Sequence, residues 1–109
     1  MSRTIRKSPQ FLADFSLQYR WYFKEAGEPL ARRYLLAVDG TLEKLSRFPE
    51  VGTLRRFPQP ELRDLRSASV ERPFDRHLVF YRFDENHLDA WRIMHGARDL
   101  PNRLVEPAE

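Results

Sequence analysis

The segment DAWRIMHGARDLP, residues 89–101, contains the residue best suited to acid–base chemistry in this chain, His95. Histidine titrates near neutral pH without tuning, so His95 could exchange a proton with a reacting oxygen within hydrogen-bond reach. The alternative interpretation is structural: His95 closes a strand and bonds to backbone in the turn at Gly96. Residue type alone favours this structural interpretation.

Arginines in the same half of the chain form a second set with possible chemistry. Guanidinium groups bind phosphate through paired N–H donors and can stabilise charge that develops on a phosphodiester. The alternative is a solvated sheet face, since ten acidic residues balance ten arginines between Arg55 and Glu109. That balance argues against a large basic patch of the nucleic-acid-binding kind. The arginines that pairing strands would bring together are Arg63, Arg66, Arg82, Arg92 and Arg98.

Other common sites are excluded by residue type or spacing. The chain has no cysteine, which excludes disulfides, thiolate metal sites and cysteine nucleophiles. Its four glycines are isolated, so no glycine-rich phosphate loop is present. The three histidines, His77, His87 and His95, have no carboxylate at a ligand spacing. We therefore expect neither a metal nor a cofactor.

Composition predicts one folded domain. The chain has 109 residues, 41% of them hydrophobic and 13% aromatic, which is enough for a single core. No signal peptide and no membrane-spanning run is recognisable, so the cytoplasm is the expected compartment. Arginine outnumbers lysine 16 to 3. This bias fits binding of phosphate or carboxylate, but a genome rich in arginine codons would produce the same count.

Two amphipathic helices are expected to position these side chains. Ser8 and Pro9 are typical of a helix start, and Gly27 of its end. A second helix should run from Glu28 to Phe48, before Pro49. The two apolar stripes recur at steps of three and four, which predicts an antiparallel hairpin. The stripes are Phe11, Leu12, Phe15, Tyr19, Tyr22, Phe23 and Ala26, then Leu30, Tyr34, Leu35, Val38, Thr41, Leu42, Leu45 and Phe48.

Strands are expected before and after the hairpin. A short strand at residues 3–7 has Ile5 inward, and a loop at 49–60 leads to three strands at 62–70, 77–83 and 87–95. In the last strand, alternation places Leu88, Ala90 and Met94 opposite Trp91 and Ile93. The tail from Asn102 is expected to be frayed. The prediction is a single α+β domain over residues 1–109: a helical hairpin on one face of a small, mostly antiparallel sheet, in the order βααβββ.

Four short motifs follow one another along the chain: FPEVG (48–52), LRDLR (62–66), RHLVFYRF (76–83) and RIMHGARDLP (92–101). Together and in this order they resemble the ParE branch of the ParE/RelE superfamily of bacterial toxins from type II toxin–antitoxin systems. The resemblance covers nearly the whole chain and implies a toxin neutralised by a cognate, ParD-like antitoxin, as a hetero-oligomer. ParE-like members inhibit DNA gyrase by binding, whereas RelE-like members cut messenger RNA on the ribosome.

The resemblance implies two sets of roles. In a RelE-like ribonuclease, Arg66, Arg82 and His95 would be the catalytic candidates. Those enzymes tend to supply lysines or arginines from the strands and a late tyrosine or histidine. Here no lysine follows Lys44 and no tyrosine follows Tyr81, which departs from that pattern. We therefore predict a non-enzymatic gyrase inhibitor without direct sequence-specific nucleic-acid binding. The target-binding candidates are Arg63, Arg92, Arg98 and Asp99.

The antitoxin-binding candidates are Leu17 and Trp21, which fall off the apolar stripe of the first helix. Buried tryptophans are frequent hot spots of protein interfaces, and an amphipathic partner helix would fit along the hairpin. In the alternative interpretation, Trp21 packs against the loop at residues 50–60 and serves only the core.

Overall fold

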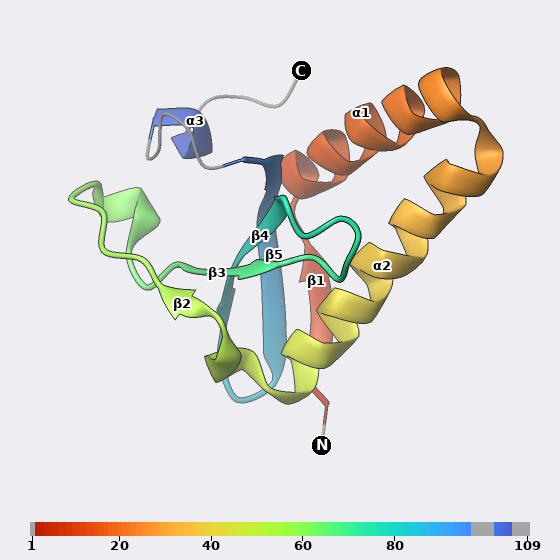
Figure 1. The fold of residues 1–109 in the computed structure, drawn as a ribbon. Helices are drawn as coiled ribbons and strands as arrows, with labels where there is room; N and C mark the ends of the chain where they lie inside the picture. Colours follow the sequence, from red (N-terminus) through yellow and green to blue (C-terminus); the bar gives the residue numbers. More distant parts are fainter. Residues whose placement is uncertain (1, 97–101, 106–109) are drawn as a thin grey trace.

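The computed structural model describes residues 2–96 and 102–105. Two long helices pack on one face of a five-stranded sheet (Figure 1), which confirms the expected α+β class. The sheet order is β1-β5-β4-β3-β2; β1 runs parallel to β5 and the other neighbours are antiparallel. The elements are β1 (Thr4–Lys7), α1 (Pro9–Ala26), α2 (Glu28–Arg47), the 3₁₀ turn η1 (Pro49–Val51), β2 (Thr53–Leu54), the 3₁₀ turn η2 (Pro60–Leu62), β3 (Arg66–Ser69), β4 (His77–Phe83), β5 (His87–His95) and α3 (Asn102–Val105).

The ends of α1 are set by the residues that the sequence indicated. The Ser8 hydroxyl accepts a hydrogen bond from the Phe11 N–H at 2.9 Å, and Pro9 occupies the first helical turn. The same hydroxyl donates to the carbonyl of Trp91 at 2.6 Å, which ties the helix start to β5. At the other end, Gly27 has φ +89° and lets the chain turn directly into α2.

The core lies between the hairpin and the sheet. It is built from Phe11 and most of the predicted α2 stripe, closed by residues of β4 and β5. The stripe predictions are wrong at their margins, because a step of one residue turns a helix by about 100°. Leu12 and Phe23 each follow an inward-facing residue and are therefore exposed. Ala26 and Phe48, at the two helix ends, are exposed as well.

A smaller apolar cluster covers the opposite face of the sheet. Phe80 and Met94 contribute to it from β4 and β5, so β4 is buried on both faces, as predicted for a central strand. The predicted alternation of β5 is wrong after Ala90. The ladder shifts between Phe80 and Tyr81, which leaves Trp91 as an extra residue of a β-bulge. Ile93 thus joins Leu88 and Ala90 in the core under the helices, and Met94 packs with Trp91 on the other face.

The segment between α2 and β4 is more structured than predicted. The loop expected at residues 49–60 contains η1 and β2, and η2 begins at its last residue; β2 extends the sheet by two residues. The strand expected at residues 62–70 begins only at Arg66. Leu62 and Leu65 are buried in the second cluster instead, and Asp64 has φ +61°, a conformation incompatible with a continuous strand.

A buried ion pair joins α1 to β5. The Arg92 guanidinium donates to both carboxylate oxygens of Asp14, at 2.7 and 2.9 Å, and Asp14 also accepts the backbone N–H of Ile93. Both side chains are almost completely removed from solvent. Arg92 further donates to the carbonyl of Leu104 at 3.3 Å, and the Leu104 side chain is fully buried. The prediction of a frayed tail is therefore wrong for residues 102–105.

The core also contains one histidine. His77 is 2% exposed and its Nε2 lies 2.9 Å from the hydroxyl of Tyr22, while its ring contacts Tyr34 and Phe74. Burial lowers the pKa of His77 from 6.5 to about 4, and the nearby His95 adds to the shift. Within the part of the chain that is described, no helix is long and apolar enough to cross a membrane.

Removing the Asp14 carboxylate should destabilise the fold strongly. Asp14→Ala breaks this buried ion pair and removes the acceptor of the Ile93 N–H, a change that typically costs about 3–5 kcal/mol. Asp89→Ala is the matched control, because Asp89 pairs with Arg6 at 2.6 Å on the exposed surface. We expect a large fall in the urea midpoint for Asp14→Ala and little change for the control. If Asp14→Ala and Asp89→Ala unfolded at the same urea concentration, the buried pair would not stabilise the fold.

The free energy of unfolding should fall as the pH drops from about 6.5 to about 4. Over that range the unfolded chain binds a proton at His77 and the folded chain does not, so protonation favours unfolding. His77→Gln removes the group, and its unfolding free energy should depend less steeply on pH than that of the parent. Urea titrations of both proteins at about pH 7 and about pH 4.5 measure the difference. If the free energy of unfolding changed by the same amount between the two pH values in both proteins, the result would contradict a neutral, buried His77.

Candidate interaction surfaces

The outward side of α1 carries two apolar side chains that the core does not use. Leu17 is 40% and Trp21 55% exposed, which confirms their predicted outward placement. They lie one helical turn apart and are therefore neighbours on the helix surface. The Trp21 ring meets the Tyr22 ring edge-on, with centroids 5.4 Å apart. Because more than half of Trp21 is exposed, the alternative interpretation, burial against the loop at 50–60, is wrong. We call Leu17 and Trp21 the hairpin ridge.

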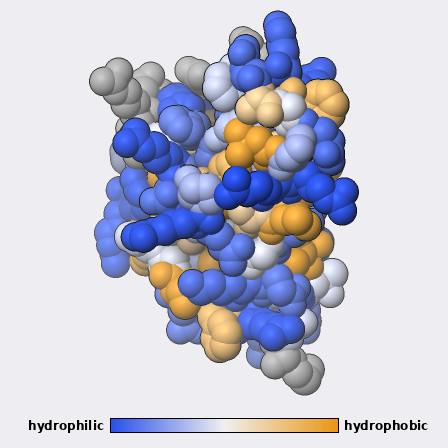
Figure 2. Space-filling model, turned by 45° about the vertical axis from the view of Figure 1, so that its right-hand side comes forward, coloured by the Kyte–Doolittle hydropathy of each residue, from blue (hydrophilic) through white to orange (hydrophobic). Residues whose placement is uncertain are grey.

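Further apolar side chains are exposed on the two helices. On the side of the molecule that carries the hairpin, apolar groups lie between strongly hydrophilic ones rather than forming one continuous patch (Figure 2). Leu12 and Phe23 on α1 and Leu36 on α2 are each at least half exposed. Sequence periodicity assigned Leu12 and Phe23 to the core, so their exposure was missed.

The three residues proposed for ribonuclease chemistry do not converge. Arg66 pairs with Tyr81 in the β3–β4 ladder and shares its sheet face, which is the face under the helices. His95 pairs with His77 at the other end of β4, four positions from Tyr81, or about 13 Å along the strand. Arg82 follows Tyr81 in β4 and points to the opposite face. A single phosphate could not contact all three.

Arg66 and Arg82 instead hold backbone segments in place. Arg82 donates to the carbonyls of Arg63 and Glu61, both at 2.6 Å, and its guanidinium lies over the Trp91 ring at 5.4 Å. Arg66 donates to the carbonyl of Gly52 at 2.9 Å. These contacts match the planar, multi-donor geometry of the guanidinium group, which lysine cannot reproduce.

The predicted target-binding residues have different environments. Arg63 is exposed. Arg92 is 3% exposed, and its guanidinium is engaged with Asp14 and the α3 backbone, so the expectation that it faces a partner is wrong. The β-bulge at Trp91 and the approach of α1 to β5 enclose it, and neither feature is visible in the sequence. Arg98 and Asp99 lie outside the described residues.

His95 is exposed at the end of β5. Its ring packs edge-on against the His77 ring, with centroids 4.8 Å apart. The Gly96 N–H that follows donates to the carbonyl of Arg76 at 2.8 Å, and Arg103 donates to the carbonyl of His95 at 3.4 Å. The ring contact with His77 and these hydrogen bonds together order this corner of the fold, although sequence reasoning considered His77 only as a metal ligand.

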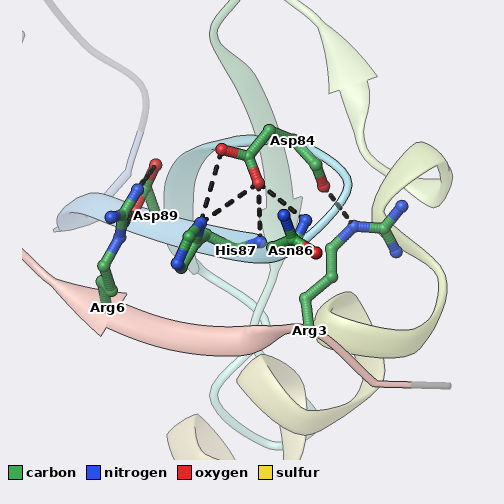
Figure 3. A network of polar contacts seen from close by, with 6 residues as sticks. All are labelled: Arg3, Arg6, Asp84, Asn86, His87 and Asp89. Atoms are coloured by element: carbon green, nitrogen blue, oxygen red, sulfur yellow. Dashed lines mark hydrogen bonds and ion pairs between the residues drawn. The ribbon is translucent and has the colours of Figure 1, made fainter.

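The turn between β4 and β5 is held by a polar network (Figure 3). The Asp84 carboxylate accepts the backbone N–H groups of Asn86 and His87, at 2.8 and 2.7 Å, and lies 3.3 Å from the His87 Nδ1. These N–H donors lower the pKa of Asp84. Arg3 donates to the Asp84 carbonyl at 2.6 Å. The network stabilises a turn, and residues 2–96 and 102–105 contain no group of side chains that could hold a metal ion.

Comparison with known proteins identifies the family. The family model of the ParE toxin of type II toxin–antitoxin systems, parDE, matches residues 5–100. Among solved structures, a protein of the chromosomal ParDE toxin–antitoxin system from P. aeruginosa is similar in fold, with a TM-score of 0.68 and 17% sequence identity over 88% of this chain and 98% of that one. No curated protein matches the sequence. Because the family model spans most of the chain, this protein belongs to the ParE toxin family of type II toxin–antitoxin systems.

Proposed function

We propose that this ParE toxin arrests growth by binding and inhibiting DNA gyrase, without catalysing a reaction. Family membership supports this proposal, and the observation that carries it is the separation of Arg66, Arg82 and His95 on two faces of the sheet. Cleavage of RNA by its own 2′-hydroxyl requires a base, an acid and cations around one phosphate. Arg66, Arg82 and His95 do not form such an arrangement, whereas a binding function requires only a complementary surface.

The alternative function, ribosome-dependent cleavage of messenger RNA, predicts a different cellular response. Inhibition of gyrase should give filamentous cells with an induced DNA damage response. Ribonuclease activity should abruptly stop protein synthesis and leave new messenger ends in ribosome-bound transcripts. Tightly controlled expression separates the two.

We further propose that a ParD-like antitoxin neutralises the toxin by laying an amphipathic helix along the hairpin ridge. Trp21 offers a large, half-exposed ring next to Leu17. Two cationic side chains, Arg20 and Lys24, flank the ridge on the same helix and suit an acidic partner. Arg63, Arg98 and Asp99 remain the candidates for contact with the target.

His95→Ala should leave toxicity largely unchanged, because an inhibitor that acts by binding needs no proton transfer. Loss of a general acid or base from an enzyme would instead slow cleavage by about 10²-fold or more. Growth arrest after induction, compared at equal amounts of folded protein, measures the effect. If His95→Ala abolishes toxicity while its circular dichroism and thermal midpoint stay those of the parent, the enzymatic alternative is favoured.

Trp21→Asp should weaken antitoxin affinity by at least about tenfold, in line with the loss of an interface hot spot. The thermal midpoint of the free toxin should change little, because Trp21 is more than half exposed. Leu36→Asp provides the matched control, since Leu36 is equally exposed but lies on the outer face of α2. Titration calorimetry with the antitoxin compares the three proteins. Equal affinities for both variants would place the docking surface away from the hairpin ridge.

A further inference from the structure

Three large apolar side chains are exposed where α2 meets the sheet. Phe48, Val51 and Leu54 are 61%, 56% and 38% exposed, within seven consecutive residues. Phe48 precedes the 3₁₀ turn η1 and Val51 ends it, and the Val51 N–H donates to the Phe48 carbonyl at 3.2 Å, so one tight turn carries both side chains. Leu54 pairs with Arg66 in the β2–β3 ladder and shares its face, next to that turn. We call Phe48, Val51 and Leu54 the corner patch.

Buried side chains fix the backbone that carries this patch. The hydroxyl of Tyr81 donates to the carbonyl of Pro49 at 2.6 Å and accepts the N–H of Gly52 at 3.0 Å. A side chain at position 52 would collide with that hydroxyl, so only glycine fits. Arg66 donates to the carbonyls of Gly52 and Glu50. Because the turn is already ordered, a partner that binds the patch has little conformational entropy to remove.

The surroundings of the patch are cationic. Arg3 and Arg66 each place a guanidinium near the Phe83 ring, at 5.3 and 5.7 Å from its centroid. Their hydrogen bonds go to backbone carbonyls, and neither guanidinium forms an ion pair with a carboxylate of residues 2–96 or 102–105. Figure 3 shows the Arg3 guanidinium directed away from the Asp84 carboxylate, which faces its own turn. Arg56, two positions beyond Leu54, is also exposed.

Acidic residues around the patch compensate only part of this charge. Glu50 is the one carboxylate on the η1 turn itself, and Glu43 is paired with Arg47 at 3.1 Å. An apolar centre with a cationic rim is the complement of a protein surface that offers apolar side chains between carboxylates. A nucleic acid fits less well, because two of the three apolar side chains are aliphatic and cannot stack on bases.

We propose that the corner patch is a docking surface for an acidic protein segment with apolar side chains between its carboxylates. It lies at the end of α2 and β2, whereas the hairpin ridge is on α1, towards the opposite end of the molecule (Figure 1). The two surfaces could therefore be occupied by two partners, or by two parts of one partner. The inference does not depend on gyrase as the target.

A synthetic peptide that alternates glutamate with leucine is a suitable probe. It should shift the backbone amide resonances of residues 48–56 in ¹⁵N-labelled protein and approach saturation by about 1 mM. A peptide that alternates lysine with leucine should bind at least about tenfold more weakly. A peptide that alternates glutamate with serine should leave these resonances unchanged.

Variants locate the site. Val51→Asp should abolish the response and Arg56→Glu should weaken it, whereas Leu36→Asp should respond as the parent does. All three positions are exposed, so the variants should fold. The proposal is overturned if the glutamate peptide shifts none of residues 48–56, or if Val51→Asp and Leu36→Asp respond alike. It is also overturned if a single-stranded oligonucleotide shifts the same amides at lower concentration than the peptide.

Discussion

The arrangement of the molecule depends on the buried ion pair between Asp14 and Arg92. β1 pairs with β5 only as far as Ala90, so the remaining part of β5 has an edge without a neighbouring strand on that side. α1 covers this edge, and Asp14 supplies the acceptor for the Ile93 N–H and the counter-ion for Arg92. A buried charge of this kind is costly unless it is paired, so the helix, the strand and α3 are held in one relative position. Because Leu17 and Trp21 are on α1, the ion pair also fixes the location of the hairpin ridge relative to the sheet.

Three arginines in the second half of the chain have a role that the sequence did not indicate. The sequence allowed phosphate binding or a solvated sheet face, whereas the structure shows that these side chains connect elements of the fold. Arg66 and Arg82 bond to backbone carbonyls of the segment between α2 and β3, and Arg92 joins three elements. These three arginines do not converge on one phosphate site, and they do not form a solvated sheet face. A planar guanidinium with several donors suits this use, because it can satisfy two carbonyls from one direction. Both proposed docking surfaces, the hairpin ridge and the corner patch, combine exposed apolar side chains with nearby cationic ones.

Local patterns in the sequence were sufficient to predict the helices and the central strands. Ser8, Pro9 and Gly27 mark the helix ends through their own backbone and hydrogen-bonding properties. The predictions from sequence are wrong where contacts between residues far apart in the chain determine the local structure. The β-bulge at Trp91 reverses the faces of Ile93 and Met94, and the burial of Leu62 and Leu65 replaces half of a predicted strand with irregular structure. Helical spacing was sufficient to predict that Leu17 and Trp21 are exposed. The burial of Arg92 could not be predicted from local spacing, because it depends on the β-bulge and on the contact with α1.

If this ParE toxin inhibits gyrase by binding, its effect should depend on the ratio of toxin to gyrase. Supercoiling of relaxed plasmid by purified gyrase, measured at a fixed enzyme concentration and increasing toxin, tests it most directly. Stoichiometric binding predicts that activity falls as the toxin concentration approaches that of gyrase, and that added antitoxin restores it. Undiminished supercoiling with a large excess of toxin would contradict the account, above all if sub-stoichiometric toxin cleaved messenger RNA on programmed ribosomes.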